Sequence, residues 1–304
     1  MMRKVNKDFH APPVALQQGF AEKEKNLLEK TSAHQFDGRI YNTAVKQELK
    51  KLYHNKCAYC ERMMGDEDFT VEHYRPKKGD YSYYWLGYEW SNLLPVCTTC
   101  NNPKGDKFPV AVPSRVMPKS DKKSRVKAPQ LLADGDLDIE AMKADHPYLT
   151  DEKPYLLHPE IDEPKDFLSV KRTGELIPQV KKEVNAYQYK RADETINLTH
   201  LNRDVLVYGR RKLIQPFEKF FQEQTKMFLE ERANQHDFAS SVRLTYFVLF
   251  NMLENQCKEE HEYTLTGWCL WKNIKEMLFK KIYKDNKEIE QLLDYALDLY
   301  KEST

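Results

Sequence analysis

Four cysteines in two Cys-x-x-Cys pairs constrain this chain more than any other feature of its sequence. The pairs are Cys57 with Cys60 and Cys97 with Cys100. Each pair bends the chain so that two sulfurs face one point, and two such pairs complete a tetrahedral site that suits zinc. Four thiolates leave no open coordination position, so we expect a structural Zn. The alternative is four ordinary buried or redox cysteines.

Composition and charge limit the remaining possibilities. The chain has 304 residues, enough for about two domains. Its formal net charge is only +1, so any nucleic-acid-binding surface must be local. The most apolar stretch, 242–253, is short and carries Arg243, so we expect no membrane span. Six cysteines without a secretion signal indicate a reducing, cytoplasmic location.

Hydrophobic spacing predicts a mainly α fold with a small α+β core. Apolar residues recur at helical intervals over 14–30 and 42–54, and again from 181 to the end. A short hairpin is expected at 170–177 around Gly174. Four segments follow: an N-terminal arm and helices (1–52), a zinc-stapled module (53–112), a basic and then irregular connection (113–180), and a C-terminal helical domain (181–304).

The residues between the cysteine pairs carry groups suited to catalysis. The start of residues 69–76 reads as a strand. On a strand Glu72 and His73 would point to opposite sides, but a bend at its end, which Pro76 favours, could bring both side chains to one site. Asn92 precedes the second cysteine pair, and Asn101 directly follows it.

This pattern resembles the HNH family, also called the ββα-metal nucleases, over about residues 53–110. The resemblance rests on an acidic residue before His, an Asn-Leu step, and Cys-x-x-Cys-Asn-x-x-Lys-Gly. It implies that His73 is the general base, that Glu72 and Asn101 bind a catalytic metal, and that Asn92 orients the loop that holds His73. Glu72 stands where Asp is usual, and Asn101 where the family name expects His.

The chemistry of phosphodiester hydrolysis agrees with these roles. A neutral imidazole with a pKa of about 6.5 can take a proton from water. A divalent ion stabilises charge on the phosphate and on the leaving oxygen. Glu72 and Asn101 offer only oxygen ligands, which favours Mg or Mn. Alternatively, His73 is a histidine without chemistry and Asn92 a turn asparagine; we treat His54, His146, His158 and His200 as structural.

Basic residues near these motifs are candidates for binding nucleic acid. A basic run from Lys104 to Lys127 is a possible phosphate-binding rim, although it also fits a solvated loop. The expected contacts are Arg75, Lys77, Lys78, Lys104 and Lys107.

A second resemblance covers more of the chain and concerns its biological system. Residues 88–95, 158–164 and 198–203 are similar to HNH nuclease subunits of Septu-type and retron-linked anti-phage systems. This implies an effector nuclease controlled by an ABC- or SMC-like ATPase partner, with DNA favoured and RNA possible as substrate. The alternatives are an idle zinc module that binds nucleic acid or protein, and a stand-alone restriction or RNA-cleaving HNH enzyme.

Overall fold

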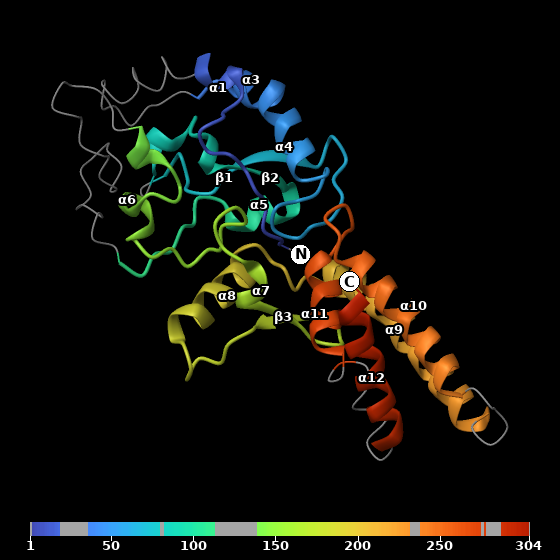
Figure 1. Cartoon of the computed structure of the whole chain (residues 1–304). Coiled ribbons are helices and arrows are strands. Elements are labelled where there is room, and N and C mark those ends of the chain that lie inside the picture. The colour runs from blue at the N-terminus through green and yellow to red at the C-terminus, as the bar shows by residue number, and fades with distance from the viewer. Residues whose placement is uncertain are drawn as a thin grey trace. The chain divides into compact units, whose positions relative to one another are not determined.

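The structure is a computed structural model, and it shows the predicted mainly α fold with small two-stranded sheets (Figure 1). It describes residues 2–18, 36–79, 82–112, 139–231, 238–274, 277 and 287–303. By their contacts, residues fall into two compact units. The first comprises Met1–Leu168 and Pro178–Leu201, and the second Ser169–Ile177 and Asn202–Thr304. The four-segment division expected from the sequence stays a prediction.

A ββα arrangement forms the centre of the first unit's site. Strand β1 (Phe69–His73) pairs antiparallel with β2 (Leu93–Cys97), with Phe69 opposite Cys97 and His73 opposite Leu93. Helix α5 (Thr98–Lys104) follows β2 without a break and contacts both strands. All five residues of β2 are buried, so this strand lies within the core.

A continuous helical stretch confirms most of the helix predicted over 42–54, and its last part packs against β2. It consists of α3 (Gly38–Ile40), the π-helix η1 (Tyr41–Val45) and α4 (Lys46–Leu52). Val45 and Leu49 are fully buried, as their helical spacing predicts. His54 and Asn55 take positive φ angles, which ends the helix after Tyr53. The other predicted helix begins as α1 (Val14–Gln18), and residues 19–35 lie outside the described residues.

The N-terminal arm is extended and is part of the core. Met2 donates its backbone N–H to Tyr59 O at 3.0 Å, within the first Cys-x-x-Cys loop. The buried Lys7 ammonium donates to the carbonyl oxygens of Trp90 and Leu93 at 2.9 and 2.8 Å, and pairs with Glu160 at 2.9 Å. The arm therefore ties the cysteine loop to the turn before β2.

Short helices and irregular backbone complete the first unit. The elements are η2 (Tyr84–Leu86), η3 (Trp90–Asn92), η4 (Glu140–Met142), α6 (Pro147–Thr150), α7 (Pro164–Phe167) and α8 (Ala186–Leu198). Among them, η2, η4 and α6 contribute to a hydrophobic cluster of Tyr83, Trp85, Leu86, Met142 and Leu149.

The second unit consists of long helices and most of the predicted hairpin. The hairpin is confirmed as β3 (Leu168–Val170) and β4 (Leu176–Pro178), with Gly174 at φ +90° in the turn. Helix α10 (Phe238–Gln256) packs against the other helices, which are α9 (Asp204–Glu231), α11 (Thr264–Lys272) and α12 (Lys287–Ser303). As predicted, Phe221, Leu249 and Tyr300 are buried there.

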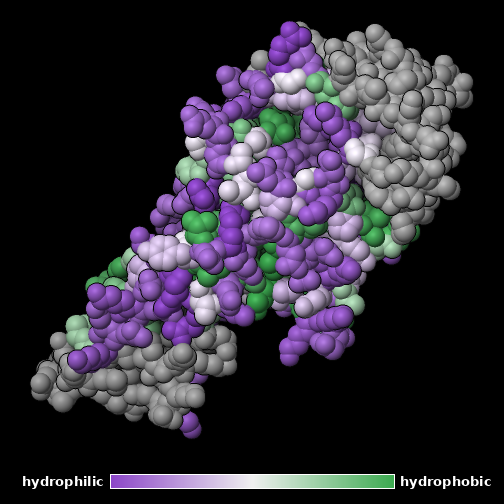
Figure 2. All heavy atoms as spheres, turned by 180° about the vertical axis from the view of Figure 1, so that it is seen from behind, coloured by the Kyte–Doolittle hydropathy of each residue, from purple (hydrophilic) through white to green (hydrophobic). Residues whose placement is uncertain are grey.

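One face of the molecule is largely polar among the described residues. Figure 2 shows one face on which hydrophilic residues dominate and hydrophobic residues gather in small groups. Of the helices that the structure describes, none combines the length and the apolarity that crossing a membrane requires.

Candidate active site

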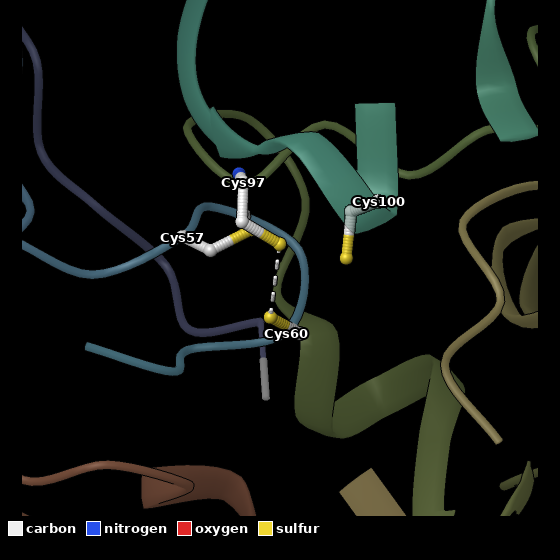
Figure 3. Close-up of side chains that lie close together, drawn as sticks. All are labelled: Cys57, Cys60, Cys97 and Cys100. Carbon is white, nitrogen blue, oxygen red and sulfur yellow. Dashed lines mark hydrogen bonds between the residues drawn. The ribbon is translucent and has the colours of Figure 1, made fainter. Parts of the chain in front are cut away.

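The four predicted zinc ligands come together in a buried cluster. The sulfurs of Cys57, Cys60, Cys97 and Cys100 all lie within 4.8 Å of one another (Figure 3). Cys60 Sγ is 3.8 Å from Cys97 Sγ, and Cys97 N donates to Cys57 Sγ at 3.4 Å. The first pair lies in the loop after α4, whereas the second joins the end of β2 to α5. The cluster therefore suits a structural metal such as zinc.

The four thiols of this cluster form hydrogen bonds with one another. A bound cation would take the place of the protons in these hydrogen bonds. Burial raises the pKa of Cys57 well above its usual value. Hydrogen bonds from Cys100 and Cys57 instead lower the pKa of Cys97. Four buried thiolates without a cation would repel one another, whereas a divalent ion stabilises all of them.

Glu72 and Asn101 lie on the face where β1 meets α5. Asn101 Nδ2 donates to Thr70 Oγ1 at 3.2 Å, two residues before Glu72 on the strand. The Glu72 carboxylate accepts a hydrogen bond from Lys104 Nζ at 2.5 Å, and Lys104 follows Asn101 by three residues on α5. Because residues i and i+2 share a face of a strand, and i and i+3 a face of a helix, Glu72 and Asn101 are neighbours.

The Glu72 carboxylate is nearly buried but has a counter-ion. Burial raises its pKa, while the positive charge of Lys104 and the hydrogen bond from it act in the opposite direction. The oxygens of Glu72 and Asn101 are the hard donors that Mg or Mn prefers, so the residues fit such an ion.

His73 is buried at the end of β1 and is held by a backbone carbonyl. Its Nε2 lies 2.9 Å from Gly87 O. A carbonyl only accepts, so Nε2 carries the proton and Nδ1 is left as the basic nitrogen. Tyr41 packs edge-on against the imidazole, with ring centroids 5.3 Å apart, and also donates to Gly87 O at 2.6 Å.

The surroundings of His73 keep the imidazole neutral. Burial lowers its pKa well below the usual value, and the charge of Lys77 adds to that effect. A neutral imidazole with one fixed N–H is the form that a general base requires.

Asn92 fixes the loop that follows His73. Its Oδ1 accepts from Arg75 N at 2.7 Å, and its Nδ2 donates to Arg75 O at 3.0 Å and to Leu86 O at 3.2 Å. Its own carbonyl accepts from Tyr74 N at 2.9 Å. This geometry fits the loop-orienting role that the HNH resemblance implies.

The expected bend lies after His73. The strand β1 continues through His73, and the backbone bends at Tyr74 and Arg75. Consecutive side chains of a strand point to opposite sides, and accordingly Glu72 and His73 have different partners. The Lys77 charge nevertheless acts on both groups, because it lowers the pKa of Glu72 and that of His73.

The five predicted nucleic-acid contacts differ in exposure. Arg75 is buried, donates to Leu149 O at 2.8 Å and pairs with Glu152, and Lys104 is buried against Glu72. Their placement therefore favours a role inside the protein. The described exposed residues Lys78 and Lys107, and the half-buried Lys77, can face a phosphate. The rest of the basic run, 113–127, lies outside the described residues.

Three features of this site were not predicted from the sequence. They are the Gly87 carbonyl that holds His73, the Tyr41 ring beside it, and the Lys104–Glu72 ion pair. A backbone acceptor leaves no signal in the residue type. The Lys of the Cys-x-x-Cys-Asn-x-x-Lys-Gly motif is the one signal that could have indicated a role for Lys104.

His158 is structural, as predicted, and gives a testable dependence of stability on pH. Its Nε2 donates to Ser91 O at 3.1 Å and its Nδ1 accepts from Glu160 N at 3.2 Å, so only the neutral form fits. Burial lowers its pKa well below the usual value. A histidine whose pKa is lower in the folded than in the unfolded protein contributes fully to stability at pH values above its unfolded pKa of about 6.5. This contribution is lost as the pH falls from about 6.5 toward the folded pKa.

We expect the free energy of unfolding of the parent to decrease faster than that of His158→Gln between pH 7 and pH 5. The difference in slope is up to about 1.4 kcal/mol per pH unit. Burial raises the pKa of Glu160, which has the opposite effect on both proteins, so the comparison between them isolates His158. Urea denaturation at several pH values measures this, and parallel pH profiles would contradict it.

Comparisons with known proteins agree with the site. Residues 57–107 match the family model for HNH endonuclease. The chain is 29% identical over 215 residues to Septu protein PtuB of Bacillus mycoides (strain KBAB4), covering 66% of this chain and 61% of that protein. It is 25% identical over 201 residues to Septu protein PtuA of the same strain, covering 62% of this chain and 24% of the relative.

A third relative belongs to a retron. A retron Vc95 protein of Vibrio cholerae serotype O1 biovar El Tor, named for an HNH endonuclease, is 30% identical over 88 residues, or 27% of this chain and 42% of that protein. The chain thus spans less than two thirds of each of these relatives. These matches confirm the predicted resemblance to HNH nucleases of anti-phage defence and support an enzyme of the nuclease class.

Proposed function

We propose that this chain, whose residues 57–107 match the HNH family, is a metal-dependent endonuclease that hydrolyses phosphodiester bonds, with DNA favoured. One observation carries the proposal. The His73 imidazole is buried with Nε2 fixed on Gly87 O, at the end of the strand that also bears Glu72. This arrangement supplies an oriented base on the residue that follows Glu72, whose carboxylate can hold a cation.

In the proposed mechanism, His73 Nδ1 accepts the proton of the attacking water. The Gly87 carbonyl and the Asn92 hydrogen bonds keep the imidazole and its loop in place for that transfer. Glu72 and Asn101 would hold Mg or Mn. When bound, such an ion supplies positive charge for the phosphate and the leaving 3′ oxygen.

The zinc cluster supports this site without taking part in the chemistry. Cys97 ends β2, and Cys100 precedes Asn101 on α5. A Zn held by the four cysteines would therefore fix α5, and with it Asn101, against the two strands.

The role of Asn101 can be tested through the metal requirement. We expect Asn101→Ala to raise the Mn concentration for half-maximal cleavage roughly tenfold or more, because a lost group at a metal site costs at least that much affinity. High Mn should restore much of the rate, since Asn101 moves no proton. The neighbouring Asn102 is exposed on the same helix, and Asn102→Ala serves as the control. An unchanged Mn requirement in Asn101→Ala would remove this residue from the site.

We propose that the second unit binds a partner, an ATPase subunit of a two-component defence system. Its support is an exposed apolar stripe on α10: Leu244, Val248 and Met252, spaced by four residues, are 67%, 45% and 47% exposed. The similarity of the chain to Septu proteins PtuA and PtuB supports a two-component defence system. The alternative is that these helices serve only as a second core.

Co-expression with the adjacent genes tests this partner. We expect the parent to co-purify with an ATPase, and Leu244→Glu with Val248→Glu to lose it while the helices stay folded. A control pair of substitutions, Glu254→Gln with Asn255→Asp, changes charge on exposed positions near the end of the same helix. A parent that purifies only as a lone nuclease would contradict the proposal.

A further inference from the structure

Lys104 is a fully buried cation at the centre of the proposed catalytic site. Its Nζ donates to Glu72 Oε1 at 2.5 Å, to His73 O at 3.0 Å and to Gly105 O at 3.3 Å. An ammonium has three donors, and these three oxygens use all of them. The charge is therefore committed to the protein and is not offered to a phosphate.

The position of Lys104 in the chain connects it to the rest of the site. It is the last residue of α5, the helix that also carries Cys100 and Asn101. Through its ammonium, the end of this helix holds both the carboxylate of Glu72 and the backbone of the base, His73. Gly105, at φ +48°, allows the chain to turn away directly after it.

A buried carboxylate without a counter-ion is strongly disfavoured, so the Lys104 charge favours the ionised form of Glu72 in this buried position. The same Lys104 ammonium is paired with the carboxylate that would bind a divalent ion. Two cations on one carboxylate repel each other, and this repulsion is little screened in a buried site.

We propose that Lys104 is a resident cation that keeps Glu72 and His73 assembled before a divalent ion binds, and that it weakens the binding of this ion. The inference rests on the proposed function, because it takes Glu72 as a metal ligand. Lys104 is a positioning residue in this account and touches no substrate.

The binding of Mn to the zinc-loaded protein, without nucleic acid, tests this directly. Electron paramagnetic resonance of free Mn measures the dissociation constant. We expect Lys104→Met to bind Mn about tenfold tighter or more, because a like charge at the ligand has been removed. Lys107→Met makes the same charge change at an exposed site three residues further, and should stay within about twofold of the parent. Adding Glu72→Gln to Lys104→Met should abolish the gain.

Each further outcome decides the inference. If Lys104→Met is unfolded without Mn but folds when Mn is added, the ion has replaced the ammonium, which supports it. Mn binding by Lys104→Met that equals or falls below that of the parent would overturn it, and so would a protein that unfolds under both conditions. If the parent cleaves nucleic acid and binds Mn, an outcome that overturns the inference about Lys104 still leaves the proposed function intact. If the parent binds no Mn at all, the proposed metal site and this inference both fail.

Discussion

Replacement of Cys97 by Ser is expected to unfold the first compact unit and to release its zinc. Cys97 ends β2 and precedes α5, and its sulfur is one of four within 4.8 Å. Structural zinc sites contribute about 10–16 kcal/mol in small modules, which equals or exceeds the whole stability of an ordinary domain, about 5–15 kcal/mol. Zinc analysis of the purified protein and thermal denaturation followed by circular dichroism measure the two effects.

Cys257→Ser is the matched control for this change. Cys257 is a free cysteine directly after α10, in the second unit and outside the cluster. The control should keep one zinc per chain and the unfolding midpoint of the parent. A folded Cys97→Ser protein with the zinc content of the parent would show that the cluster is not a structural metal site.

Replacement of His73 by Ala is expected to lower kcat by about 10²–10⁴-fold, the usual cost of a lost general base. The fold should persist, because Tyr41 still donates a hydrogen bond to Gly87 O and the site keeps its Lys104–Glu72 pair. Zinc content should also be unchanged, since His73 is not among the four sulfur ligands. Single-turnover cleavage rates, with circular dichroism and zinc analysis on the same samples, measure this.

The pH dependence of cleavage gives an independent readout for the same residue. Burial lowers the pKa of His73, so the imidazole remains a base below its ordinary pKa of about 6.5. We therefore expect kcat to rise with pH along a limb that lies on the acidic side of that value, and this limb to be absent from His73→Ala. The exposed His10 provides the control, because His10→Ala should keep both the rate and the limb.

The parts of the site that were predicted from the sequence are local ones. The cysteine spacing predicted the sulfur cluster, because each pair needs only a short turn to converge. The start of residues 69–76 was read as a strand, which β1 confirms, and the HNH resemblance implied that Asn92 orients the loop that it does bond. Helical spacing in the second half predicted the buried faces around Leu249 and Tyr300.

The parts that were not predicted depend on contacts between distant segments of irregular backbone. The partner of His73 is a carbonyl, which any residue at position 87 would offer. The N-terminal arm gave no sign that Lys7 would reach Glu160 in the core. A basic residue near a motif also does not show whether its charge faces outward. Arg75 and Lys104 turned inward to Glu152 and Glu72, because those buried carboxylates require counter-ions.

The most direct test of the proposed function is cleavage by the purified, zinc-loaded protein of plasmid DNA and of tRNA. Parent and His73→Ala are compared in Mg, in Mn and in a chelator that leaves the zinc in place. We predict cleavage by the parent only with Mg or Mn, with DNA cut faster than tRNA, and products with 5′-phosphate and 3′-hydroxyl ends. Equal cleavage by His73→Ala under the same metal conditions would contradict the assignment of His73 and its neighbours as the active site.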